Sequence, residues 1–209
     1  MGEDIVLWGA LHFVSCGFYI DIGAMDPDAH SVTKLFYDLG WSGINVEPRP
    51  HAIAAFRDRR PRDVNLECAV ASEAASLTIT EYNGHEGLST AVQAVADHWS
   101  SRGLVGRSFE VPCKTLLEIC DLAPKDIHFL KIDVEGAELD VIKSGDFSRY
   151  RPWILAIEST FPGTYDDNHQ DWEPLVLGAD YDLALFHGIN RYYVAREHIN
   201  LKGHIRTPG

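Results

Sequence analysis

Positive charge is scarce in this chain of 209 residues. Eighteen Lys and Arg residues are outnumbered by 31 Asp and Glu residues, which gives a formal net charge of −13. Binding to the phosphates of a nucleic acid, or docking on an anionic membrane, needs a basic surface, so the composition argues against both partners. The 45% hydrophobic and 11% aromatic content is that of a folded globular protein, and the length fits a single domain over residues 1–209.

Cysteine and long apolar runs are also scarce. The four cysteines include no CxxC pair, so neither a structural zinc site nor a disulfide framework is expected, and a reducing cytoplasm is the simplest location. The apolar run 5–14 is interrupted by a histidine and follows two acidic residues rather than basic ones. These features favour an N-terminal core helix over residues 3–15 instead of a signal peptide or a membrane span.

What the chain does contain is a repeated order of strand, loop and helix. β-rich runs cover residues 18–23, 43–48, 64–71, 76–82, 127–134, 153–158, 181–186 and 191–196, and helical patterns cover 26–40, 51–59, 91–102 and 137–144. This alternation predicts a Rossmann-like α/β core over residues 18–197, with a mostly parallel sheet, helices on both faces and an antiparallel C-terminal hairpin. Because ligands of such sheets bind at the carboxyl ends of the strands, functional residues are expected there.

The first two predicted strands end in residues that suit a nucleoside. The first ends at Gly23, where a glycine lets the backbone turn tightly and approach a ligand, and the second ends at Glu47. Their separation of 24 residues is near the offset of about 20 residues at which an acid meets the ribose hydroxyls of an adenosine cofactor. The alternative is that Glu47 is a surface acid after an edge strand.

A complete GxGxxG fingerprint for dinucleotides is missing after this first strand. The loop that follows Gly23 contains Asp26 and Asp28 instead, and like-charge repulsion makes it a poor cradle for a diphosphate. An adenosine ligand that has no phosphate and carries cationic groups fits better. S-adenosylmethionine, with a sulfonium and an ammonium, is such a ligand, and it points to a methyltransferase.

Acidic residues also stand at the ends of two later strands. Asp133 and Glu135 close the run at 127–134, and Glu158 ends the run at 153–158. On neighbouring strands, Asp133 and Glu158 would converge on one cleft, where they could hold a divalent cation or act as a base and its orienting partner. The alternative for Asp133 and Glu135 is a structural role at a helix N-terminus.

Several segments, in order along nearly the whole chain, resemble FkbM-type methyltransferases. They are residues 19–24, 31–33, 40–48, 129–138, 151–154 and 188–194. The block Lys-Ile-Asp-Val-Glu-Gly-Ala-Glu at 131–138 is the most specific of them. The resemblance implies a class I methyltransferase sheet and an S-adenosylmethionine-dependent O-methyltransferase that acts on a hydroxyl of a sugar, a glycan or a related natural product.

The matched motifs also imply roles for single residues. The cofactor site would comprise Asp21, Gly23, Ala24, Ser31, Glu47, Pro48, Ala69, Val70, Asp133 and Glu135. Within it the first three would shape the cofactor loop, and Glu47 would bind the ribose. Ala69 and Val70 would border the adenine, and the last two would lie beside the methionine part or the acceptor. The chain departs from the family pattern at His187, where relatives often carry an acid.

Methyl transfer to an alcohol requires removal of a proton, because sugar hydroxyls are very weak acids. We predict His187 or His30 as the base, with Asp133 and Glu158 orienting it or binding a metal ion. The acceptor is expected to be a small molecule or a glycan that packs on aromatic rings near the cleft. The candidates for these rings are Trp99, Phe161, Tyr165 and Trp172.

Two alternatives to methyl transfer share the same sheet. One is a NAD-dependent sugar oxidoreductase or epimerase, against which the missing fingerprint and the acidic loop both count. The other is a non-catalytic module of a glycan-assembly protein that acts beside glycosyltransferases, and the acids at three strand ends disfavour it. The sequence indicates no oligomeric state.

Overall fold

The computed structural model describes residues 2–73, 75–124, 126–164 and 166–208. Its main sheet consists of β1 (Phe18–Ile22), β2 (Ser42–Val46), β3 (Val64–Leu66), β7 (Phe129–Ile132), β8 (Ile154–Glu158), β9 (Tyr181–His187) and β10 (Asn190–Ala195). The order is β3-β2-β1-β7-β8-β10-β9; the pairs from β3 to β8 are parallel, and β10 is antiparallel to both of its neighbours. The expected Rossmann-like sheet is confirmed, and its C-terminal hairpin folds back so that β10 lies next to β8.

Helices cover both faces of this sheet. One face carries α1 (Glu3–Leu11), α2 (Lys34–Asp38) and η3 (Arg196–His204), and the other carries α5 (Leu116–Cys120), α6 (Glu138–Lys143) and α7 (Glu173–Gly178). Side chains alternate between the two faces along each strand. Tyr19 packs toward α1 and α2, whereas Ile20 and Ile22 pack toward α5 and α6. The same period of two puts Asp21 of β1 and Lys131 of β7 on the α1 face.

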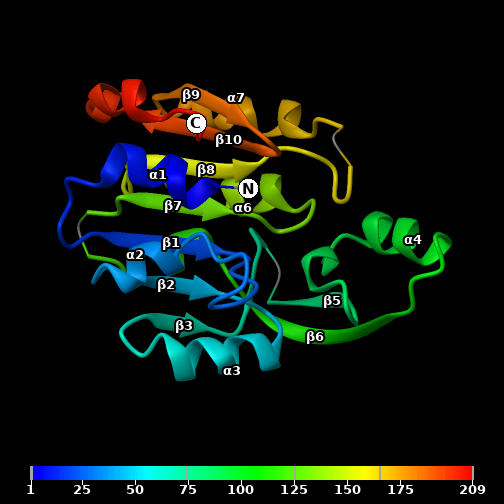
Figure 1. Cartoon of the computed structure of the whole chain (residues 1–209). Helices are drawn as coiled ribbons and strands as arrows, with labels where there is room; N and C mark the ends of the chain where they lie inside the picture. The colour runs from blue at the N-terminus through cyan, green and yellow to red at the C-terminus, as the bar shows by residue number, and fades with distance from the viewer. Residues whose placement is uncertain (1, 74, 125, 165, 209) are drawn as a thin grey trace.

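A second sheet stands beyond the carboxyl ends of the parallel strands (Figure 1). It consists of β4 (Ala69–Val70), β5 (Ser76–Tyr82) and β6 (Gly106–Lys114) in the order β4-β6-β5, and η1 (Glu86–Leu88) and α4 (Gln93–Ser101) complete this lobe. The strand predicted at 64–71 is therefore two strands, one in each sheet. β6 was not predicted, because it contains a glycine and a proline and most of its side chains are exposed, so no apolar period marks it.

Two helices are shorter than the sequence pattern predicts. α1 ends at Leu11 rather than at residue 15. The helix expected from residue 26 begins only at Lys34. The reason lies at Asp26, whose carboxylate accepts hydrogen bonds from the backbone nitrogens of Asp28 at 2.8 Å and Ala29 at 2.7 Å. Aspartate in this arrangement holds the chain in a turn and delays the helix.

The remaining elements lie at the edges of the main sheet. α3 (Pro50–Arg59) packs beside β3, and the short turn η2 (His169–Asp171) leads into α7. All four cysteines are free thiols. Among the described residues, none of the helices combines the length and the apolar character that crossing a membrane requires.

Candidate active site

Two cavities open at the carboxyl ends of the parallel strands. The smaller one lies between the main sheet and the lobe. Its lining includes seven of the residues predicted for the cofactor: Gly23, Glu47, Pro48, Ala69, Val70, Asp133 and Glu135. Cys68, Leu77, Ile79 and Ala91 add apolar surface, and sequence reasoning had not included these four. The lobe therefore supplies much of the apolar wall.

The larger cavity adjoins the smaller one and is lined by more charged side chains. The predicted residues on its surface are Asp21, Gly23, Ala24, His30, Ser31 and Asp133. Gly23 and Asp133 line both cavities, and Lys131 lines the larger one. Glu158 and His187 line neither of the two.

Gly23, which follows β1, packs against the ends of β2 and β7. Its backbone nitrogen donates to the Val46 carbonyl at 3.0 Å. Its φ is +81°, and a Cβ atom placed on it would lie 1.8 Å from the backbone oxygen of Asp133. The dihedral and the contact each oppose an L side chain. The glycine predicted for ligand approach is thus required by the close packing of the protein's own backbone.

Glu47, predicted to bind a ribose, is buried after β2 and forms an ion pair with Arg49. Its Oε1 accepts hydrogen bonds from the Arg49 backbone nitrogen at 2.9 Å and from Arg49 Nε at 2.8 Å. Its Oε2 accepts from the Met25 backbone nitrogen at 2.9 Å and from Arg49 Nη2 at 3.3 Å. Glu47 is therefore not an exposed surface acid, and both of its oxygens already have protein donors.

Lys131 stands between two of the predicted acids. The register of β1 and β7 pairs it with Asp21, and its Nζ lies 3.5 Å from Asp21 Oδ1 and 3.0 Å from Asp133 Oδ2. Burial raises the pKa of Asp21, and Lys131 opposes that effect. Burial by itself would lower the pKa of Lys131, but Asp133 and Asp21 more than offset it, so this pKa is raised and the ammonium stays charged.

The loop that carries Glu135 is held from two sides. Glu135 has a φ of +54°, a left-handed value that is rare outside glycine and strains the backbone. Glu138 Oε1 accepts from the backbone nitrogens of Val134 at 3.2 Å and Gly136 at 3.1 Å, and Thr90 Oγ1 of the lobe donates to the Glu135 carbonyl at 2.9 Å. The structural role considered for this block thus belongs to Glu138, whereas Glu135 lines the smaller cavity.

Asp133, Glu135 and Glu158 form one acidic cluster. One carboxylate oxygen from each of them lies within 4.8 Å of the other two. Glu158 Oε2 is buried and no described residue donates a hydrogen bond to it, while the Glu158 side chain contacts the Asp133 carboxylate. Burial, and then the neighbouring Asp133 carboxylate, raise the pKa values of Glu135 and Glu158. The cluster therefore gathers more acidic groups than the single charge of Lys131 offsets.

The two histidines predicted as the base occupy different places. His30 lines the larger cavity on the loop between β1 and α2, with a φ of +57°. His187 closes β9 opposite Asn190 of β10, and β10 separates it from Glu158 of β8. Of the two, His30 is the one that lines either of the two cavities described above.

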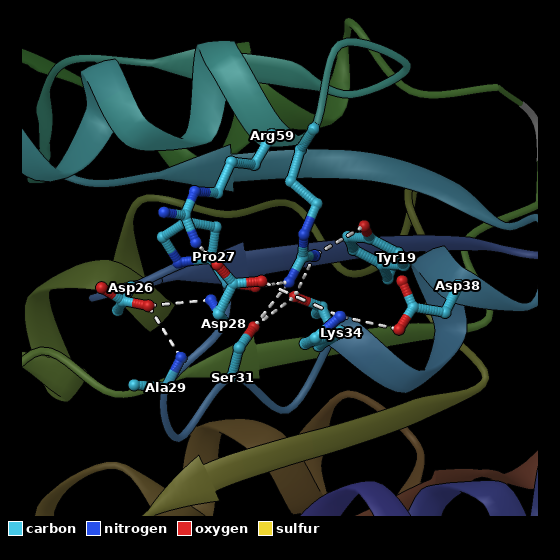
Figure 2. A network of polar contacts seen from close by, with 11 residues as sticks. Tyr19, Asp26, Pro27, Asp28, Ala29, Ser31, Lys34, Asp38 and Arg59 are labelled. Atoms are coloured by element: carbon cyan, nitrogen blue, oxygen red, sulfur yellow. Dashed lines mark hydrogen bonds and ion pairs between the residues drawn. The ribbon is translucent and has the colours of Figure 1, made fainter.

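The negative charge of the loop after β1 is partly neutralised (Figure 2). Asp28 forms ion pairs with Arg59 of α3 and, at 3.8 Å, with Lys34, which also binds Asp38 at 2.7 Å. Asp26 instead holds the turn described above. The repulsion expected against a diphosphate is therefore weaker than the number of acids in this loop suggests.

Two of the four aromatic residues suggested for acceptor binding belong to the core. Trp99 and Trp172 are 7% and 1% exposed, so neither ring offers a face to a sugar, and the prediction is wrong for both. Large aromatic side chains stabilise a core by the apolar area they bury, and a sequence pattern does not separate that use from binding. Phe161 is 53% exposed, and Tyr165 lies outside the described residues.

The fold and the site together define the structural class of this protein. A sheet in which β10 alone runs antiparallel, with acids at the carboxyl ends of its parallel strands, is the class I methyltransferase sheet. The model of the methyltransferase FkbM domain matches residues 21–183. The chain therefore belongs to the FkbM methyltransferase domain family.

Comparisons with individual proteins add one solved structure. The crystal structure of precorrin-6y C5,15-methyltransferase from Geobacter metallireducens is similar to this chain, with 12% sequence identity and a TM-score of 0.43. The match covers 91% of this chain and 85% of that one. No curated protein matches the chain.

Proposed function

We propose that this protein is an S-adenosylmethionine-dependent O-methyltransferase that acts on a hydroxyl of a sugar, a glycan or a related small natural product. The observation that carries the proposal is the pair of adjoining cavities at the strand ends. The smaller has an apolar wall that suits an adenosine, and the larger is lined by polar groups that suit an acceptor. Gly23 and Asp133 line both, so a donor and an acceptor would meet beside them.

The chemistry of the smaller cavity fits S-adenosylmethionine. Ala69, Val70 and Ile79 provide apolar surface for an adenine. Asp133 and Glu135 give this cavity a negative potential, which favours a ligand with cationic groups over one with a diphosphate. A ligand of this kind would also bring positive charge near the acidic cluster that these two acids form with a third carboxylate.

Glu47 is a carboxylate at the end of β2, where an acid that binds a ribose is expected, but both of its oxygens are already occupied. Its oxygens already accept from Arg49 Nε and Nη2 and from the Met25 backbone nitrogen. A ribose diol would have to share these oxygens or take the place of the Arg49 side chain. Arg49 is therefore part of the cofactor site that we propose, although sequence reasoning gave it no role.

S-adenosylmethionine, when bound, supplies a methyl group on a positively charged sulfur. The chain's own residues would hold the acceptor hydroxyl in line and take up its proton, and alignment of this kind accounts for a large share of the rate in such reactions. We assign the proton to a ring nitrogen of His30, because His30 lines the larger cavity. Lys131 fixes Asp133 at the junction of the two cavities, where Asp133 would orient the acceptor hydroxyl.

Calorimetry with S-adenosylmethionine, S-adenosylhomocysteine and NAD in parallel tests the cofactor. We expect saturable binding of the first two and none of NAD. Glu47→Gln should weaken that binding, whereas Glu67→Gln, which changes an acid outside both cavities that pairs with Arg57, should not. Binding of NAD alone would instead favour an oxidoreductase, and binding of neither cofactor would favour a non-catalytic module.

Mass spectrometry of sugar and glycan acceptors, read as the gain of a methyl group, tests the reaction. A general base contributes about 10²–10⁴-fold to such a step, so His30→Asn should lower turnover by that order while cofactor binding stays unchanged. His187→Asn, at the sheet edge, should have a much smaller effect. Full turnover of His30→Asn, or an equal loss in both variants, would contradict the assignment of the base.

A further inference from the structure

We propose that Asp133, Glu135 and Glu158 form a binding site for a hard divalent cation, Mg²⁺ or Mn²⁺. One oxygen from each carboxylate lies within 4.8 Å of the other two. Asp133 and Glu135 follow β7, Glu158 ends β8, and these two strands are parallel neighbours, so the sheet itself brings the three together. Contact between the ion and an acceptor oxygen rests on the proposed function, whereas binding of the ion does not.

A buried oxygen without a hydrogen-bond donor points to a ligand at this cluster. Glu158 is 5% exposed, and no described residue donates a hydrogen bond to its Oε2; the side chain contacts instead the Asp133 carboxylate, which is another acceptor. A buried polar atom that is left unpaired is unfavourable, and native proteins contain few of them. A cation between the three carboxylates would supply the missing contact.

The described residues do not balance the negative charge of the cluster. The ammonium of Lys131 lies close to both Asp133 and Asp21, so one positive charge serves two carboxylates. Glu135 and Glu158 form no ion pair with any described residue. With all four of these carboxylates ionised, the single ammonium leaves an excess of three negative charges, and a divalent ion would offset two of them. Arg49, which lines both cavities, is already paired with Glu47.

Glu138, the fourth acid of this region, does not compete for the ion. Its Oε1 accepts from the backbone nitrogens of Val134 and Gly136, and its Oε2 accepts from Asn168 Nδ2 at 3.3 Å. These bonds fix the loop that carries Glu135. Glu138 therefore supports the ligands of the proposed site from outside it.

The donor set and its spacing select the class of ion. Ligands of Mg²⁺ lie about 2.1 Å from the metal, so adjacent ligands are about 3 Å apart and opposite ones about 4 Å apart. Carboxylate oxygens within 4.8 Å of one another reach such spacing by moving about 1 Å. The cluster offers oxygen ligands and neither histidine nor cysteine, which favours Mg²⁺ or Mn²⁺ over zinc or copper. Three protein ligands also leave positions for water or an acceptor oxygen.

Titration of the full chain with Mn²⁺, followed by loss of the EPR signal of the free ion, tests the site. We expect saturable binding of a single ion, with Mg²⁺ in competition. Glu158→Gln keeps the side-chain shape and removes a charged ligand, so it should weaken Mn²⁺ affinity at least about tenfold. Glu67→Gln, away from the cluster, should leave the affinity unchanged. Glu135→Gln should act like Glu158→Gln and serves if the latter does not fold.

Two outcomes would overturn the site. One is a lack of saturable Mn²⁺ binding, or affinity in both cluster variants equal to that of the wild type. The other is displacement of Mn²⁺ by S-adenosylmethionine, because the cluster would then serve the cationic part of the cofactor. Calorimetry of S-adenosylmethionine without metal separates this proposal from the proposed function. Mn²⁺ binding without cofactor binding would refute the proposed function and support the ion site. Cofactor binding without Mn²⁺ binding would refute the ion site alone.

Discussion

The carboxylates on the two sides of the strand-end surface differ in how their negative charge is balanced. After β2, Glu47 accepts hydrogen bonds from Arg49 and Met25 on both of its oxygens. At the ends of β7 and β8, Glu135 and Glu158 have no cationic partner among the described residues, and Glu158 Oε2 accepts no hydrogen bond. Burial alone therefore does not say what a carboxylate at a strand end is for.

The difference separates an acid whose charge is paired within the protein from acids whose charge has no ion-pair partner among the described residues. Breaking a buried ion pair leaves one charge unpaired in a medium of low dielectric, so Glu47 keeps its position whether or not a ligand is present. An unmatched carboxylate destabilises the folded chain until a proton or a cation reaches it. The Glu47 side of the site is thus paired within the protein, and the side of Glu135 and Glu158 is the one expected to respond to a bound cation.

Gly23 connects the two sides, so a methyl group added there should disrupt both. Its Cβ would collide with the Asp133 backbone oxygen at 1.8 Å, and we expect Gly23→Ala to lower the free energy of unfolding by more than about 4 kcal/mol. Urea denaturation measures the loss. Gly40→Ala is the control, since φ is +95° there but nothing lies within 4 Å of an added Cβ; strain alone should cost about 1–2 kcal/mol. Similar small losses at both positions would show that the loops separate easily.

Removing the charge of Glu47 should cost far more than removing that of Glu158. Glu47→Gln leaves Arg49, which is 2% exposed, without its carboxylate, and we expect a loss of about 3–5 kcal/mol in the free energy of unfolding. Glu158→Gln, measured in the same way without divalent ions, removes an acid that has no cationic partner and should be close to neutral or stabilising. A loss for Glu158→Gln as large as that for Glu47→Gln would refute the contrast drawn above.

Weakening the hydrogen bonds that hold the loop of Glu135 should have a moderate effect on stability. Thr90→Val removes the hydrogen bond to the Glu135 carbonyl and the one that Thr90 Oγ1 accepts from the Val92 backbone nitrogen at 3.0 Å. We expect a loss of about 1–2 kcal/mol by urea denaturation, with weaker Mn²⁺ binding. Thr78→Val, on the exposed side of β5, should change the stability by less than about 0.5 kcal/mol. Unchanged Mn²⁺ affinity in Thr90→Val would separate the loop from the ion site.

The smallest effect is expected in the loop after β1. Asp28 and Arg59 are both substantially exposed, and pairs of this kind contribute about 0–1 kcal/mol. Asp28→Asn should therefore barely change the unfolding midpoint, and NAD should still fail to bind in calorimetry. A gain of NAD binding would instead show that the negative charge of this loop selects against NAD.

Sequence reasoning located residues whose chemistry coincides with a strand end. The spacing of Gly23 and Glu47 placed both beside one cavity, and the run that ends at Asp133 marked the other side of the site. Lys131 lay within the same motif but received no role. Its pairing with Asp21 depends on the register of β1 against β7, and a local pattern does not contain that register.

Other features escaped prediction because long-range contacts determine them. β6, nine residues long with mostly exposed side chains, carries no apolar period and is a strand because β4 and β5 pair with it. Arg49 follows a strand end, where a basic residue usually reaches solvent, yet it is buried on Glu47. The burial of Trp99 and Trp172 likewise follows from tertiary packing.

The close packing of Gly23 against Asp133 couples the two cavities. The Gly23 backbone is bonded to the end of β2 and lies against the Asp133 carbonyl with no room for a side chain, so the two loops cannot shift independently. Both residues border both cavities. Occupancy of one cavity is therefore expected to change the affinity of the other, and thermodynamic linkage makes that change reciprocal. A donor and an acceptor would then bind cooperatively through a contact that neither of them makes.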